Sequence, residues 1–247
     1  MRSITIKNFA LKIFKNKVYF TILFLTILFI DIFIKTNVED LSYRYFSKSL
    51  VIISLFLFYC INKFGSLNAF KFNTIVISLV FFLIGDLLII NHLNPVFFTS
   101  AMILFVIGKI MYCINFSNNR DFNLTRLLPF CLFSFILMVS VLILVIDNLG
   151  DYFLPVLLYF FITLLMFLFA YLRKSDVNAK SYYQVFLGMF IFLLSETIFL
   201  IKTFYIPIPY NQTLIMLTYG LAQYFIIIGL VNEQKLPDPF GLNNSSF

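Results

Sequence analysis

Ionisable side chains inside apolar runs that are long enough to cross a lipid bilayer include Asp86, Lys109 and Glu196. Another, Lys48, stands at the start of a further such run. A charge at mid-bilayer costs about 2.5–3.5 kcal/mol on insertion scales, so such residues usually pair, face a wet cavity or have a function. Two carboxyl groups sharing a cavity can serve as an acid held protonated and a carboxylate held ionised. The alternatives are structural: Asp86 paired with Lys48, and Lys109 as a counter-charge.

Three further polar residues lie near these groups in predicted depth. Tyr219 and Gln223 are spaced i, i+4 and therefore share one helical face. Hydrogen bonding between helices explains them as well as substrate contact does. Asp31 lies close to the end of its apolar run, so we expect its carboxylate to extend to the membrane interface, a structural role.

The elements that position these residues are predicted to be transmembrane helices. Of the 247 residues, 62% are hydrophobic and 12% are charged, against about 25% charged in soluble domains. Lipid offers the backbone no hydrogen-bond partners, and the runs do not alternate as barrel strands would. The sequence predicts an all-α, polytopic membrane bundle of about eight helices, near residues 18–35, 46–63, 74–91, 95–116, 127–147, 152–172, 181–203 and 211–232.

The domain organisation and orientation follow from the charges between the runs. We expect a basic cytoplasmic N-terminus (1–17), a transmembrane domain (18–232) and a short flexible cytoplasmic tail (233–247). Thirteen of the 18 Lys and Arg residues fall on the side of the two termini, four fall on the other side, and Lys109 lies within a span. This asymmetry predicts a cell-membrane protein with both termini in the cytoplasm.

Several classes of partner and cofactor are not expected. The net charge of +7 is spread between the apolar runs, so it indicates topology and no nucleic-acid surface. The three cysteines form no CxxC pair, and the single histidine, His92, stands in a short loop. We therefore expect no metal site, no cofactor and no obligate protein partner.

Five segments, in order along residues 44–232, resemble motifs of the YhhN-like lysoplasmalogenase family. Phe82–Ile89 contains a Gly-Asp pair within an apolar helix, which is the family signature. The others resemble a Lys-Pro-Leu, a Phe-x-x-x-His-x-x-Tyr, a Gly-Ala-x-x-Phe-x-x-Ser-Asp and a Tyr-x-x-x-Gln motif, and they lie at residues 48–50, 105–112, 188–196 and 219–223. The family is an eight-helix one, in agreement with the count of apolar runs.

The resemblance implies hydrolysis of the vinyl ether bond of a lysoplasmalogen or a related ether lysolipid, with a lysophospholipid-like membrane lipid as substrate. On this basis Asp86 and Glu196 are the expected catalytic pair. The expected substrate-binding residues are Lys48, Lys109, Tyr112, Ser195, Tyr219 and Gln223.

The sequence departs from the family pattern at three positions. Ser49 replaces a proline, Lys109 replaces a histidine, and Glu196 replaces an aspartate. Lysine in place of histidine removes a group that shuttles protons near neutral pH. These departures favour an alternative function without catalysis: a lipid-binding or sensory bundle, or a small proton-coupled transporter.

Overall fold

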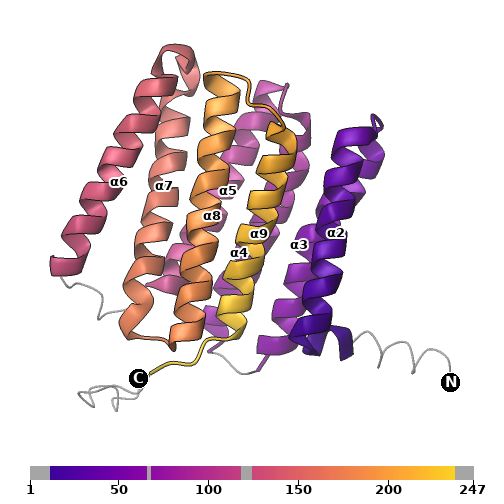
Figure 1. Cartoon of the computed structure of the whole chain (residues 1–247), viewed down its shortest axis with the longest axis vertical. Coiled ribbons are helices and arrows are strands. Elements are labelled where there is room, and N and C mark those ends of the chain that lie inside the picture. The colour runs from indigo at the N-terminus through magenta and orange to yellow at the C-terminus, as the bar shows by residue number, and fades with distance from the viewer. Residues whose placement is uncertain (1–11, 66–67, 118–123, 237–247) are drawn as a thin grey trace.

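The computed structural model describes residues 12–65, 68–117 and 124–236, and within them the chain is a bundle of eight long helices (Figure 1). All eight are long and apolar enough to cross a membrane, which confirms the predicted all-α membrane fold. The helices are α2 (Lys17–Asn37), α3 (Leu41–Lys63), α4 (Ala69–Leu88), α5 (Pro95–Phe116), α6 (Leu124–Val145), α7 (Phe153–Leu172), α8 (Ala179–Phe204) and α9 (Asn211–Val231). Arg2, Lys7, Arg120 and the tail after Leu236 lie outside the described residues.

The helices run alternately up and down, so that α2 begins and α9 ends at the same end of the bundle (Figure 1). We call the opposite end, where α2, α4, α6 and α8 finish, the distal end. Helix α9 packs chiefly against α8 and also contacts α2 and α3, while α5 packs between α4 and α7. Helix α6 lies at the edge, on α7 and α8. This order places α4, which carries Asp86, between α3 and α5, and α8, which carries Glu196, between α7 and α9.

Polar side chains at the turns fix where several helices begin. The side chains of Asn16, Asp40, Asn68 and Asn94 each accept a hydrogen bond from a backbone N–H in the first turn of the following helix. Such N-caps satisfy donors that would otherwise have no partner. Pro95 follows Asn94 at the first helical position, where its missing N–H costs nothing.

Two glycines bring the helices that carry the intramembrane charges close to their neighbours. A Cβ atom at Gly85 would lie 2.7 Å from the Phe105 ring of α5. A Cβ atom at Gly188 would lie 2.9 Å from the Ala222 carbonyl oxygen and 2.9 Å from the Ile226 nitrogen of α9. Small residues at such contacts are typical of membrane helix pairs, since they let the backbones approach.

Asp31 does not extend to the membrane interface, so that expectation was wrong. Its side chain is 1% exposed and accepts a 2.6 Å hydrogen bond from the Ser47 hydroxyl of α3. The buried serine on the neighbouring helix offers a donor inside the bundle, and the carboxylate therefore turns inward.

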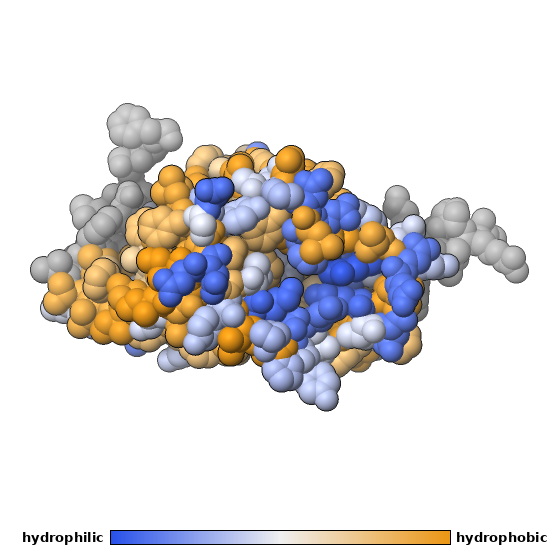
Figure 2. Space-filling view, turned by 90° about the horizontal axis from the view of Figure 1, so that it is seen from above, coloured by the Kyte–Doolittle hydropathy of each residue, from blue (hydrophilic) through white to orange (hydrophobic). Residues whose placement is uncertain are grey.

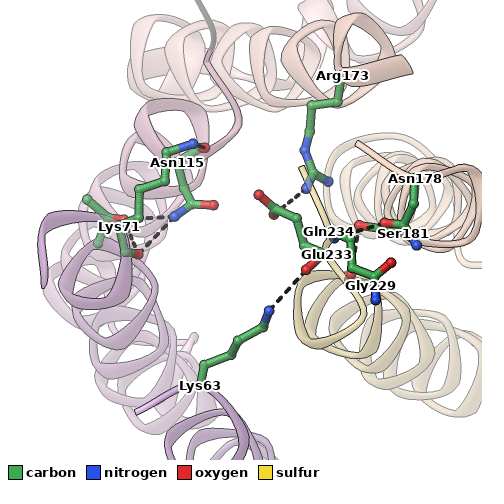
Figure 3. Close-up of polar contacts among 10 residues, drawn as sticks. Lys63, Lys71, Asn115, Arg173, Asn178, Ser181, Gly229, Glu233 and Gln234 are labelled. Carbon is green, nitrogen blue, oxygen red and sulfur yellow. Dashed lines mark hydrogen bonds and ion pairs between the residues drawn. The ribbon is translucent and has the colours of Figure 1, made fainter. Parts of the chain in front are cut away.

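The segment after α9 folds back over the turn between α7 and α8 (Figure 3). Its backbone pairs with that turn, through Asn178 N to Gln234 O and Leu236 N to Asp176 O, both 3.0 Å. Arg173 Nη2 forms an ion pair with Glu233 Oε2 at 2.7 Å. Residues 233–236 of the predicted tail are thus attached to the bundle at the end opposite the distal end.

Candidate active site

A cavity of about 160 Å³ reaches into the bundle from the distal end. Side chains from α2, α3, α4, α5, α7, α8 and α9 and from the loop after α4 line it. Asp86 and Glu196 both face this one space, although 110 positions of sequence separate them. The lining is Lys35, Arg44, Lys48, Phe82, Asp86, Ile89, His92, Met102, Phe105, Tyr159, Phe192, Ser195, Glu196, Phe199, Lys202, Asn211, Gln212, Ile215, Met216 and Tyr219.

Asp86 is held from two sides. Lys48 Nζ lies 3.0 Å from Oδ1, and the Tyr219 hydroxyl donates to Oδ2 at 2.9 Å. The carboxylate is 2% exposed, and Lys48 lines the cavity beside it. Both partners of this ion pair are therefore within reach of anything that fills the cavity.

Glu196 is held more tightly, by three side chains. Lys109 Nζ lies 2.9 Å from Oε2, Thr163 Oγ1 lies 3.1 Å from the same oxygen, and the Tyr159 hydroxyl donates to Oε1. Lys109 is completely buried, and its ammonium lies 3.1 Å from the centroid of the Tyr159 ring. Because Glu196 lines the cavity and Lys109 does not, the pair presents its negative end to the cavity.

The mouth of the cavity is strongly basic. Lys35, Arg44 and Lys202 line it from α2, α3 and α8, at the ends of these helices, and His92 lines it from the loop after α4. Partial burial and the neighbouring Lys202 lower the pKa of His92, which favours the neutral form of this side chain. Figure 2 shows hydrophilic residues gathered on one half of the distal end, over the side of the bundle where α2 and α3 lie.

The structure brings some of the predicted site residues together and leaves others behind the cavity wall. Asp86, Glu196, Lys48, Ser195 and Tyr219 line the cavity. Of these, Ser195 is engaged with the backbone, since its hydroxyl donates to a carbonyl oxygen of α9 at 3.2 Å.

Lys109, Tyr112 and Gln223 do not line the cavity. Lys109 is connected to the cavity through Glu196 and through the Tyr159 ring. The Tyr112 hydroxyl donates to Gln223 Oε1 at 3.0 Å, and both side chains are fully buried. This hydrogen bond joins α5 to α9. Hydrogen bonding between helices is one of the two roles that the sequence suggested for Gln223.

Sequence reasoning missed Tyr159 and Thr163, the two neighbours of Glu196 on α7. Their i, i+4 spacing was a usable signal, the same one that singled out Tyr219 and Gln223. From the sequence, Lys35, Arg44 and Lys202 served only to predict the orientation of the helices in the membrane. No group of three or more His, Cys, Asp or Glu side chains that could hold a metal ion occurs within residues 12–65, 68–117 and 124–236.

Comparison with known proteins gives one match. A model of the YhhN family matches residues 43–230, which is well over half of the chain and includes all of the intramembrane charges except Asp31. No curated protein and no solved structure matches the chain.

Proposed function

This chain belongs to the YhhN family, and from that membership and its cavity we propose that it is a membrane hydrolase of lysoplasmalogens or related ether lysolipids. The observation that carries the proposal is the meeting of Asp86 and Glu196 in one cavity of the bundle. Vinyl ether hydrolysis needs a proton donor at the β-carbon and a stable negative charge near the oxygen-bearing carbon. Two carboxyl groups in different surroundings supply that combination.

The reaction consumes one water molecule. A carboxylic acid transfers its proton to the β-carbon of the enol ether, and the oxygen-bearing carbon becomes an oxocarbenium centre. Water adds to that centre and returns a proton to the carboxylate. The hemiacetal then collapses to a fatty aldehyde and the phosphate-bearing glycerol, and the carboxylic acid has regained its proton.

We assign the ionised carboxylate to Glu196. Three donors hold its two oxygens, one of them the ammonium of Lys109, and protonating Glu196 would leave that buried cation uncompensated. The negative charge faces the cavity, where it would stabilise a developing oxocarbenium centre in surroundings of low dielectric constant.

Asp86 is then the acid. In the structure it is paired with Lys48, which also lines the cavity and can turn to a substrate phosphate. Moving the ammonium from the carboxylate to the phosphate removes what favours the charged form of Asp86, so substrate binding itself prepares the proton donor. Tyr219 keeps the carboxyl group in place during this exchange.

The size of the cavity limits how a lipid can occupy it. A volume of about 160 Å³ is close to that of an engineered protein cavity of about 150 Å³ that binds one benzene molecule. The polar part of a lysolipid and its vinyl ether fill this space, and the alkyl chain must leave between helices toward the surrounding lipid. Phe82, Phe105 and Phe192 line the apolar part of the cavity.

The test is aldehyde release by the purified protein from an alkenyl lysophospholipid in a nonionic detergent. We expect turnover by the wild type and a loss of about 10²–10⁴-fold in Asp86→Asn, the range for a general acid. Glu233→Gln is the matched control, because it breaks the ion pair with Arg173 at the opposite end. Absence of turnover by wild type, or full activity in Asp86→Asn, would contradict the proposal.

One observation supports the alternative of a proton-coupled transporter. Lys109, Thr163, Tyr159 and Glu196 form a continuous chain of proton-bearing groups inside the membrane. Such chains serve as relays in transporters. Proton-gradient-dependent flux in liposomes, lost in Glu196→Gln and retained in Glu233→Gln, would favour transport; aldehyde release without flux would favour hydrolysis.

A further inference from the structure

The charges of the cavity lining do not balance. Lys35, Arg44, Lys48 and Lys202 all line the cavity. The lining carboxylates are Asp86 and Glu196, and Glu196 is already neutralised by Lys109. Even with Asp31 counted, which lies behind the wall and is bonded to Ser47, the positive charges outnumber the carboxylates.

Three of these cations have no ion-pair partner within the described ranges. Lys48 is paired with Asp86, but no carboxylate lies within 4.0 Å of the charged nitrogens of Lys35, Arg44 or Lys202. All three are partly buried, so water screens their charge less than it would on a free surface. A partly desolvated cluster of like charges is a site that an anion stabilises.

The cavity lining offers no unpaired carboxylate to a positive group. A choline or ethanolamine headgroup carries an ammonium as well as a phosphate, and a carboxylate is the group that neutralises an ammonium. Among the lining residues both carboxylates are engaged by lysines. The nearest other acids of this end in sequence, Glu39 and Asp40, lie in the turn between α2 and α3 and do not line the cavity.

The separation between the cations of the mouth and the carboxylates deeper in the cavity agrees with the dimensions of a lysolipid. Lys202 follows Glu196 by six residues on α8, which corresponds to about 9 Å along the helix axis at 1.5 Å per residue. This separation is comparable with an extended glycerol backbone between a phosphate and an ether-linked chain. A phosphate at the mouth therefore places an ether bond near the carboxylates.

We propose that Lys35, Arg44 and Lys202 at the mouth, together with Lys48 beside Asp86, select a single-chain lipid whose headgroup is net anionic, such as a phosphate monoester or a phosphoglycerol, over zwitterionic headgroups. This inference rests on the proposed function only for the ether lipid as substrate. The selectivity for a negative headgroup is a binding property and can be measured without turnover.

The experiment uses saturated 1-alkyl lysolipids, which lack the vinyl ether and cannot be hydrolysed by this chemistry. Binding of the phosphoglycerol and phosphocholine forms, with the same chain, is measured on the purified full chain in a nonionic detergent. We expect the phosphoglycerol lipid to bind at least about tenfold more tightly, because the choline ammonium would lie beside cations that have no ion-pair partner, and like charges repel. Equal affinity of the wild type for the two lipids overturns the proposal.

Charge variants locate the selectivity. Arg44→Gln/Lys202→Gln should abolish the difference between the two lipids, whereas Arg44→Lys/Lys202→Arg, which keeps both charges, should retain it. The matched control is Lys174→Gln/Lys180→Gln, which removes two exposed cations at the opposite end and should leave the difference unchanged. Selectivity that survives in Arg44→Gln/Lys202→Gln overturns the proposal.

Soluble anions distinguish a lipid site from a phosphate site. Inorganic phosphate and glycerol 3-phosphate should displace the phosphoglycerol lipid only at concentrations far above that of the lipid. Displacement at comparable concentrations would overturn the lipid assignment and identify a site for a free phosphate. Because none of these measurements requires catalysis, an inactive protein with the expected binding would refute the proposed function and leave this inference intact.

Discussion

Replacing Glu196 by Gln leaves the Lys109 ammonium in the bundle interior without its carboxylate partner. The two charges are 2.9 Å apart, which gives an attraction of about 6 kcal/mol at an effective dielectric constant of about 20. Desolvation of the two ions offsets much of this attraction in the intact pair. Loss of one partner costs about 3–5 kcal/mol, because the remaining charge keeps its desolvation penalty.

The reverse replacement and the combination complete a double-mutant cycle. Lys109→Met should destabilise the protein by a similar amount, since Glu196 then keeps its charge beside the apolar methionine side chain. The double variant Lys109→Met/Glu196→Gln removes both charges at similar volume and should lie within about 1.5 kcal/mol of wild type. It should nevertheless be at least about 100-fold slower in aldehyde release, because the ionised carboxylate is gone.

Thermal unfolding in detergent is the assay for this cycle. The chain has no Trp, but Cys60 and Cys113 are partly buried and free, so a thiol-reactive dye reports their exposure. Cys131 is exposed and is replaced by Ser to remove its background. We expect the single variants to melt on the order of 10 °C below wild type and the double variant close to it.

Two results would refute this reasoning. Single variants as stable as wild type would mean that the pair is not closed inside the bundle. A double variant with full hydrolytic activity would mean that Glu196 contributes no charge to the reaction, whatever its effect on stability.

Three other perturbations test separate parts of the structure. Gly188→Ala should destabilise the protein by about 1–3 kcal/mol in the same thermal assay, because its Cβ would meet backbone atoms of α9 at 2.9 Å; unchanged stability would contradict the close packing. Tyr219→Phe should lower kcat about tenfold with little change in KM, since it removes the donor that positions Asp86; a change in KM alone would assign Tyr219 to substrate binding. In a cysteine-free background, a membrane-impermeant maleimide on intact cells should label Tyr210→Cys at the distal end and not Lys174→Cys; the opposite pattern would reverse the proposed orientation.

The fold was predictable because lipid imposes a length and a composition on every spanning helix. The errors lie at the polar first turns. The second and third apolar runs were placed at 46–63 and 74–91, whereas the helices begin at Leu41 and Ala69. Asp40 and Asn68 cap these earlier turns. A search for apolar runs misses these turns because they are polar. The first turn of α3 carries Arg44 to the mouth of the cavity.

The site was predictable only in part. Asp86 and Glu196 stand out because a carboxylate in an apolar run is costly, so each needs an explanation. Their meeting in one cavity was not predictable, since a sequence gives depth along a helix but not which helices are neighbours. Tyr159 and Thr163 were missed because an aromatic ring or a hydroxyl in an apolar run is explained by packing or by a bond to its own backbone.

Hydrolysis of an alkenyl lysolipid by the wild-type protein in deuterated water tests the central claim most directly. If Asp86 protonates the β-carbon, each aldehyde released carries one deuterium on the carbon next to the carbonyl, and Asp86→Asn releases almost none. The aldehyde incubated with Asp86→Asn controls for later exchange. No aldehyde, or aldehyde that carries no deuterium, would contradict proton transfer to the vinyl ether in this cavity.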